Sequence, residues 1–208
     1  SSVMFPADTS KPLRYNKQQL VPFGEFLPLR GMFPPQMDDT FAMLAKDVTP
    51  GSDTTVFRFQ DPQAGKVALG PFICYESMYP VYARAMTRQG ANLLVTQSND
   101  DWFQSQAAME QHVSAVVLRA IETRRQIVRS TTTGVTCFID SHGSVLQQAQ
   151  VNTKAVLKHS VVLREGMTLY VLFGDWFVLA CVVLLFLAVR ASKGNPETPG
   201  DTTPGDQE

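Results

Sequence analysis

A cysteine directly follows an apolar run in the stretch GPFICYESMYP, residues 70–80. Cys74 is followed at once by Tyr75 and Glu76. Such a thiol is either a small buried hydrophobe or a nucleophile. At the junction of a strand and a helix, the helix N-terminus would stabilise the reactive thiolate. The backbone N–H groups of the turn, beginning with Tyr75, would face a developing oxyanion.

A lysine and a glutamate bracket a second short stretch, YNKQQLVPFGEF, residues 15–26. Lys17 and Glu25 lie on either side of apolar residues interrupted by Pro22 and Gly24. Taken singly, each charge is typical of a solvated surface. Together with the cysteine stretch, however, this pair strengthens the interpretation of Cys74 as a nucleophile. The chemistry therefore depends on whether the fold brings the two stretches together.

Strands and helices alternate in the middle of the chain, so we predict an α/β domain with helices packed on a sheet. In this prediction Cys74 ends the strand at 66–74, and a turn over Asp140–Gly143 closes a hairpin within 135–148. The predicted strands are 66–74, 91–99, 126–134, the hairpin 135–148 and a last strand 154–163, and the predicted helices are 79–90 and 106–125.

The segments on either side of this pattern have different compositions. Residues 30–51 combine Met and Phe with Pro and Asp, so we expect a long binding loop or lid. Residues 167–189 are almost entirely apolar and would extend about 35 Å as a helix, enough to cross a bilayer core. We expect a transmembrane helix there, with a buried core helix as the alternative. Residues 191–208, rich in Pro, Gly, Thr and acids, should be a disordered tail.

The bulk composition excludes several classes of function. The 208 residues carry a net charge of -1, so the sequence shows no electrostatic signal for nucleic-acid binding. The three cysteines, Cys74, Cys137 and Cys181, have no C-x-x-C spacing, which argues against a zinc site or a disulfide framework. We expect Cys137 in the core, and for His112 we expect packing or a structural hydrogen bond.

Several stretches, taken in order, resemble the apolipoprotein N-acyltransferase family, the membrane-bound branch of the nitrilase superfamily. The most specific pieces are K-x-x-L-V-P-F-G-E from Lys17, C-Y-E from Cys74 and S-N-D-x-W-F from Ser98. The resemblance extends from about Arg14 to Trp176. It implies a nitrilase-type α-β-β-α sandwich, incomplete at its N-terminal side, over residues 1–165. A transmembrane helix over 166–190 and a disordered tail over 191–208 would follow.

The resemblance also implies roles for individual residues. Cys74 would be the nucleophile that carries an acyl chain as a thioester, and Lys17 would stabilise the oxyanion. Glu25 and Glu76 would orient Lys17 and the substrate amine, next to Tyr75. Substrate would be bound by Ser98, Asn99 and Trp102. Separately, because Phe23, Phe26, Met32 and Phe33 cluster beside the lysine motif, we expect them to line an acyl-chain entrance. For Ser98, Asn99 and Trp102, a strand-end cap and a core aromatic are equally good readings.

The implied reaction moves an acyl chain from a membrane phospholipid to the N-terminal cysteine amine of a lipoprotein, without metal or cofactor. Its place would be the bacterial inner membrane, with the catalytic domain on the periplasmic side. One departure stands out: no glutamate lies between Ser1 and Lys17, where the family carries its general base. We therefore expect this chain to be the C-terminal part of a longer enzyme and to be inactive alone. The rivals are a membrane-anchored amidase and a non-catalytic tethered relative.

Overall fold

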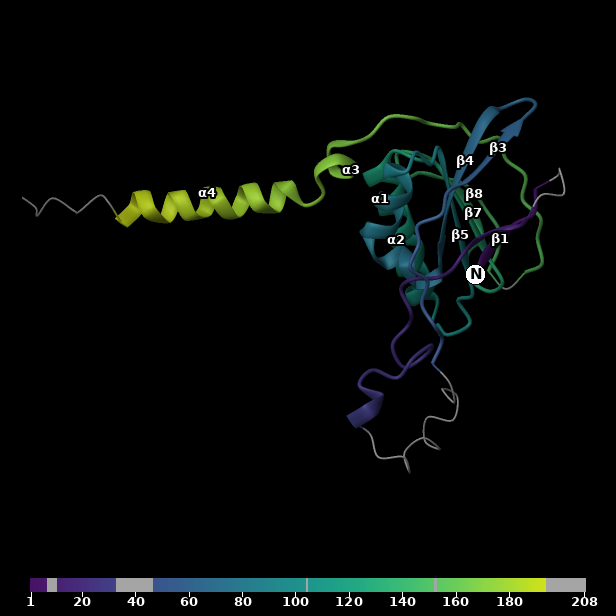
Figure 1. Ribbon diagram of the computed structural model, residues 1–208, viewed down its shortest axis with the longest axis horizontal. Helices are drawn as coiled ribbons and strands as arrows, with labels where there is room; N and C mark the ends of the chain where they lie inside the picture. The colour runs from purple at the N-terminus through teal and green to yellow at the C-terminus, as the bar shows by residue number, and fades with distance from the viewer. Residues whose placement is uncertain (7–10, 33–46, 104, 152, 194–208) are drawn as a thin grey trace, which may run out of the picture. The chain divides into compact units, whose positions relative to one another are not determined.

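The computed structural model describes residues 1–6, 11–32, 47–103, 105–151 and 153–193 (Figure 1). Its main element is a six-stranded mixed sheet with the strand order β3-β4-β5-β6-β7-β8. The three central strands are parallel and the outer pairings are antiparallel. The strands are β3 (Phe57–Asp61), β4 (Gly65–Ile73), β5 (Leu93–Ser98), β6 (Ile127–Thr131), β7 (Cys137–Ile139) and β8 (Val145–Gln148).

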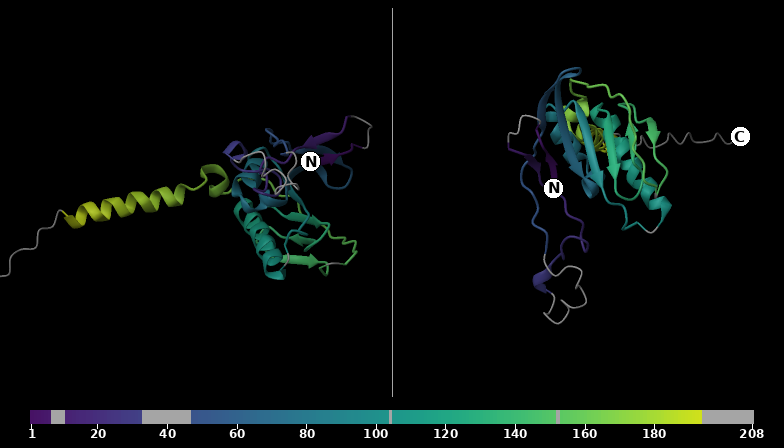
Figure 2. Two further views of the ribbon diagram at one scale, coloured as in Figure 1. Left: turned by 90° about the horizontal axis from the view of Figure 1, so that it is seen from below. Right: turned by 90° about the vertical axis from the view of Figure 1, so that its right-hand side faces the viewer.

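Two helices connect the parallel strands. Helix α1 (Pro80–Arg88) joins β4 to β5, and α2 (Gln106–Thr123) joins β5 to β6. Because successive right-handed crossovers progress in one direction along the sheet, both helices cover the same face, as Figures 1 and 2 show. The Ser105 side chain caps α2 by accepting a hydrogen bond from the backbone of Ala108.

The core lies between these helices and the sheet. It is built from buried apolar side chains that include Phe72, Met86, Leu94, Val116 and Ile127. The apolar runs of the parallel strands fill this layer, as expected of strands that a helix covers. The carboxyl ends of β4, β5 and β6 meet at one edge of the sheet, since Ile73 pairs with Gln97 and Ser98 with Thr131. Ligand sites of α/β sheets form at such edges.

The N-terminal residues form a separate two-stranded antiparallel sheet from β1 (Ser2–Met4) and β2 (Leu13–Tyr15). The buried ring of Tyr15 anchors the end of β2 in the main core. The chain continues into the lysine stretch and then into a short 3-10 helix, η1 (Arg30–Met32). Segment 47–51 lies beside that stretch, because Gly51 donates a backbone hydrogen bond to Lys17 at 2.7 Å.

The α/β class is confirmed, and the strands and helices from 66 to 148 form close to their predicted bounds. The predicted last strand over 154–163 is wrong, because this segment is irregular and Val156 is 98% exposed. Its backbone contacts are irregular as well: Val162 donates to the side chain of Gln126 rather than to a neighbouring strand. The predicted lid falls largely on 33–46, outside the described residues.

The chain divides into two units after Leu172. The first ends in α3 (Leu169–Phe173), and the second holds α4 (Trp176–Lys193), which is shorter than the transmembrane helix predicted over 166–190. Among the described residues, none of the helices combines the length and the apolar character needed to cross a bilayer. The transmembrane prediction is therefore not supported by the structure. Most of the predicted tail, 194–208, lies outside the described residues.

Candidate active site

Cys74 lies at a sharp turn between strand and helix. Strand β4 ends at Ile73, and the 3-10 helix η4 (Cys74–Met78) begins at the next residue. The turn gives Cys74 a φ of 51°, in the left-handed region that residues with a Cβ rarely adopt. A non-glycine residue in this region is a mark of functional sites, where the surrounding structure holds the strain. The thiol is free and half-buried.

Glu76 ties this turn to the lysine stretch. Its side chain is fully buried, and Oε1 accepts hydrogen bonds from the Tyr15 hydroxyl at 2.8 Å and the Gln18 backbone at 2.6 Å. Oε1 also receives the Gln19 N–H at 3.3 Å, and Oε2 receives the Ile73 N–H at 2.6 Å. The Glu76 carboxylate thus joins Ile73, at the end of β4, to residues just before and just after Lys17.

The phenol of Tyr15 is part of the same arrangement. Burial and then the neighbouring Glu76 carboxylate raise the pKa of Tyr15 well above its ordinary value. The phenol therefore stays protonated and donates to Glu76. Because a buried carboxylate needs such donors, the burial of Glu76 depends on the lysine stretch being in place.

Lys17 forms an ion pair with Glu25. Lys17 Nζ lies 2.7 Å from both carboxylate oxygens, and its side chain is only 9% exposed. Glu25 Oε2 also accepts the backbone N–H of Val21 at 2.8 Å, and the Val48 backbone N–H donates to the Glu25 carbonyl at 2.9 Å. Charge-assisted bonds of this length fix the position of the ammonium.

The structure therefore brings the two chemistry-bearing stretches together. Gln18 directly follows Lys17, Glu76 lies two residues after Cys74, and the two are joined by a 2.6 Å hydrogen bond. Tyr75, next to the cysteine, accepts a hydrogen bond from the Tyr79 hydroxyl at 3.2 Å and packs edge-on against that ring.

The predicted substrate-binding residues lie on both sides of this turn. Asn99 follows β5 and accepts hydrogen bonds from Thr132 at 2.9 Å and Thr133 at 2.8 Å. Trp102, in the same loop, is 63% exposed rather than a core aromatic. On the lysine side, Phe23 is exposed at a positive φ and Phe26 is half-buried.

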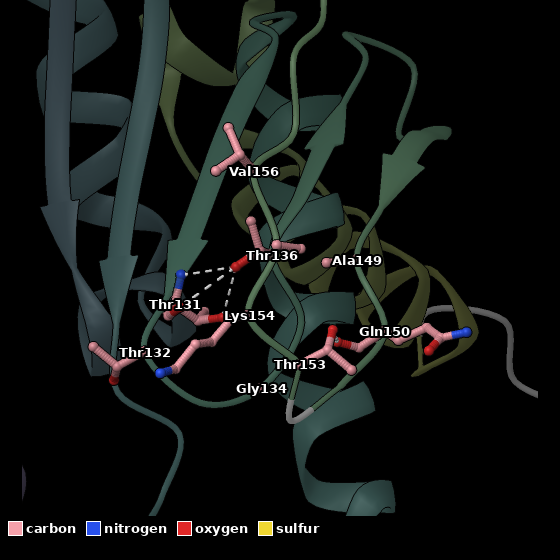
Figure 3. Close-up of a pocket in the computed structure, with 10 residues that line it drawn as sticks. Thr131, Thr132, Gly134, Thr136, Ala149, Gln150, Thr153, Lys154 and Val156 are labelled. Atoms are coloured by element: carbon pink, nitrogen blue, oxygen red, sulfur yellow. Dashed lines mark hydrogen bonds between the residues drawn. The ribbon is translucent and has the colours of Figure 1, made fainter.

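Two cavities border these residues. One, of about 330 Å³, lies on the lysine side and is lined by Gln18, Gln19, Leu20, Phe26, Asp47, Val48 and Pro50. The other, of about 380 Å³, lies beyond the end of β6 (Figure 3) and is lined by residues 131, 132, 134, 136, 149, 150 and 153–156. Within its wall, the Thr136 hydroxyl accepts a hydrogen bond from the Thr131 N–H at 3.1 Å. Thr132 connects this second cavity to Asn99.

A buried polar cluster lies behind the turn, and of its members only Ser98 was assigned to the site by sequence reasoning. Ser98, Asp100, His112 and Arg129 are all buried. Burial on its own would raise the pKa of Asp100, but the hydrogen bond to His112 and the charge of Arg129 outweigh it and lower that pKa. One signal was available in the sequence: a charged arginine inside the apolar strand 126–134 requires a buried partner.

The model of the carbon-nitrogen hydrolase family matches residues 1–166. The chain belongs to this family. The matched residues include Cys74, Lys17 and Glu25 together with all six strands of the main sheet. The strand-to-helix turn at Cys74 is thus part of the family domain.

Curated relatives of this chain carry the name apolipoprotein N-acyltransferase. The chain is 37% identical to that of Geobacter metallireducens over 169 residues, covering 81% of this chain and 31% of the relative. It is 33% identical to that of Thermotoga maritima over 181 residues, covering 86% and 34%. The chain therefore spans about a third of the length of these relatives.

Solved structures of the same superfamily are more distant. A carbon-nitrogen hydrolase from Helicobacter pylori is 17% identical with a TM-score of 0.43, covering 51% of this chain and 43% of that one. A variant of a Nesterenkonia amidase from the nitrilase superfamily is 18% identical with a TM-score of 0.47, covering 68% and 48%.

Proposed function

We propose that this domain carries the catalytic cysteine of an N-acyltransferase, which moves an acyl chain from a membrane phospholipid to the N-terminal amine of a lipoprotein. The observation that carries the proposal is the turn at Cys74, joined through Glu76 to the Lys17–Glu25 ion pair. The names of the relatives support the class of reaction and the lipoprotein acceptor.

The first half-reaction forms a thioester. The Cys74 thiolate attacks the carbonyl carbon of the phospholipid ester, and the carbonyl oxygen becomes an oxyanion. Lys17 and the backbone N–H of Tyr75 stabilise that charge. Collapse of the intermediate breaks the ester C–O bond and releases a lysophospholipid, whose alkoxide takes a proton.

The second half-reaction returns the free thiol. The lipoprotein amine attacks the thioester carbon, the C–S bond breaks, and the amine proton is transferred as the amide forms. Splitting one acyl transfer in this way gives ping-pong kinetics. Glu25 holds Lys17 in place for both halves, and Glu76 holds the lysine stretch against the turn.

Two surfaces are suited to the two substrates. The cavity beside Phe26 begins at Gln18 and Gln19, which Glu76 binds, so it lies next to the turn and offers apolar wall for an acyl chain. Phe23 extends that wall at the surface. We assign the acceptor side to Ser98, Asn99 and Trp102, where the exposed Trp102 ring is available and the buried Ser98 hydroxyl supports the loop through Asp100.

Membrane contact is the second part of the proposal. Nearly every large apolar side chain of α4 is exposed, among them Phe177, Leu184 and Leu187. Exposed apolar surface of this extent marks a site of membrane or protein contact. We place the domain at the bacterial inner membrane, on the periplasmic side, with α4 in contact with lipid.

A mass-spectrometric assay tests the function. The 208-residue chain and a chimera, in which the preceding part of the Geobacter metallireducens relative is joined to it, are incubated with phospholipid and a diacylated lipopeptide. We expect the chimera to yield an acyl-Cys74 thioester and an N-acylated peptide. We expect the 208 residues alone to yield neither, because general-base catalysis contributes about 10²–10⁴ in rate.

The controls separate the rival functions. Cys74→Ala and Lys17→Met in the chimera should abolish product. Release of free fatty acid without N-acylated peptide would instead indicate an amidase-like hydrolase. An unacylated Cys74 in the chimera would indicate a non-catalytic relative, and normal acylation of the 208-residue chain would refute the need for a further base.

A further inference from the structure

Three buried side chains form a line of hydrogen bonds behind the Cys74 turn, outside the Lys17–Glu25 pair. Asp100 and Arg129 are fully buried, and His112 is 2% exposed. Asp100 Oδ2 accepts a hydrogen bond from Arg129 Nη2 at 2.5 Å, and Oδ1 lies 3.0 Å from His112 Nδ1. Ser98 adds a hydroxyl donor to Oδ1 at 2.6 Å.

The three residues of this line come from a strand, a helix and the loop after a second strand. Arg129 belongs to β6, and its Nε donates to the Val135 carbonyl at 3.1 Å. His112 belongs to α2, and Asp100 follows β5. A Cβ at Gly134 would lie 2.8 Å from the Asp100 Cβ, so this glycine allows the Asp100 loop to pack closely. The His112 ring is therefore held from behind.

The line ends on the carbonyl of the cysteine itself. His112 Nε2 lies 3.1 Å from the Cys74 carbonyl oxygen and 2.7 Å from Ser77 Oγ. The Ser77 hydroxyl donates to the same carbonyl at 2.8 Å. With the ring proton assigned to Nε2, His112 donates to this carbonyl, and Nδ1 accepts at 3.3 Å from Nη2 of Arg129, whose guanidinium Asp100 holds. His112 and Ser77 thus both direct one carbonyl group.

That carbonyl shares a rigid peptide plane with the Tyr75 N–H. Since the atoms of a peptide unit are coplanar, fixing the C=O of Cys74 also fixes the direction of the N–H that follows it. The left-handed φ of Cys74, the first residue of η4, departs from helical geometry, so the direction of this plane depends on the side chains that contact it. The N–H of Tyr75 is the backbone donor assigned above to the oxyanion.

We propose that His112, held by Asp100 and Arg129 and acting together with Ser77, is a positioning residue that aims the Tyr75 N–H at the oxyanion. The inference rests on the proposed acyl transfer through Cys74. The proposal predicts that substitutions at His112 or Ser77 slow the reactions of the Cys74 thiol that pass through an oxyanion. The rates of its other reactions should not change.

Two reagents separate these cases on the 208-residue chain, because an activated ester, unlike a phospholipid, has a leaving group that departs without general-acid help. p-Nitrophenyl butyrate acylates Cys74 through a tetrahedral oxyanion, forming a C–S bond and releasing p-nitrophenolate. Iodoacetamide alkylates the same thiol by displacing iodide, without an oxyanion. Peptide mass spectrometry reports the rate at Cys74 and, as an internal control, at the exposed Cys181.

We expect His112→Leu and Ser77→Ala to slow acylation of Cys74 about tenfold and to change its alkylation less than twofold. Loss of an entire oxyanion donor costs about 10²–10³, and a misaimed donor costs less. His112→Gln, whose amide can still donate toward the carbonyl, should recover part of the rate. Ser114→Ala, on the exposed side of the same helix, is the matched control and should change neither rate.

Several results would overturn the proposal: equal losses in both reactions, no loss in either, or no recovery with glutamine. Thermal unfolding monitors the fold of each variant, and if His112→Leu does not fold, Ser77→Ala decides, since it leaves the Asp100 contacts intact. Failure of phospholipid transfer together with the selective loss would refute the proposed substrate but not the positioning role.

Discussion

At the scale of single residues, Glu76 holds the site together by its burial. A carboxylate with no exposed surface is tolerated only because four donors surround it, three of them on Oε1. The donors come from β2, from the lysine stretch and from the end of β4. The Glu76 side chain therefore acts as a structural connection between segments about 60 residues apart in sequence.

We expect Glu76→Gln to lower the free energy of unfolding by about 3 kcal/mol, because the amide NH₂ must face an N–H or O–H donor whichever way it is oriented. Urea unfolding measures the change. Tyr15→Phe is the matched control: it removes one donor and leaves the carboxylate, so a loss of about 1 kcal/mol is expected. Equal losses in the two variants would show that the carboxylate has no such role.

The lowered pKa of Asp100 predicts a pH dependence of stability. A carboxyl group whose pKa falls on folding stabilises the native state above its ordinary value of 3.8. That contribution is lost as the pH falls below about 4 and through the lower native value. Unfolding followed between pH 6 and pH 2 should therefore show a steeper acid loss for the unaltered chain than for Asp100→Asn. Parallel curves would contradict the prediction.

At the scale of elements, α1 packs closely on β4, the strand that carries Cys74. A Cβ at Gly70 would lie 2.7 Å from Met86 Cβ and 2.9 Å from Ala91 Cβ. We expect Gly70→Ala to destabilise the fold by about 1–3 kcal/mol, since α1 would have to move away from the strand. Gly31→Ala, whose Cβ would have no neighbour within 4 Å, should be nearly neutral. Thermal unfolding compares the two.

The elements that the sequence predicted well are those with a local signal. Continuous apolar runs and helical periodicity located β4, α1, β5, α2 and β6. Strand β3 was missed because its sequence, FRFQD, alternates apolar with charged or polar residues and has no continuous apolar run. It forms only by pairing with β4. The alternating 154–163 segment carries a strand-like pattern but has no neighbouring strand to pair with among the described residues.

The residues of the candidate site likewise fall into those with a local sequence signal and those without one. Cys74, Lys17 and Glu25 stand in motifs and could be recognised from the sequence. His112 was predicted to have packing or a structural hydrogen bond, and its buried hydrogen bonds confirm that much. Its partners, Asp100 and Arg129, lie 12 and 17 residues away in sequence on other elements. No local pattern encodes such contacts, since only the packed sheet creates them.

At the scale of the whole molecule, the apolar surface of α4 predicts lipid binding. We expect the chain to co-sediment with vesicles of phosphatidylethanolamine and phosphatidylglycerol. A Leu184→Glu, Leu187→Glu double variant should bind at least tenfold more weakly, because burying each leucine contributes about 1.5–3 kcal/mol. Val81→Glu, an exposed apolar position on α1, is the control and should leave binding unchanged. Binding insensitive to the α4 changes would exclude this helix as the contact.

The backbone at residue 74 would suit glycine better than cysteine, since a side chain at a φ of 51° costs about 1 kcal/mol. Cys74→Gly should therefore yield a molecule that lacks the nucleophile yet is at least as resistant to heat. Natural selection for folding alone would discard the sulfur at this position. Lineages released from the proposed acyl transfer are thus expected to drift first at residue 74, toward glycine or asparagine, while the core beneath stays unchanged.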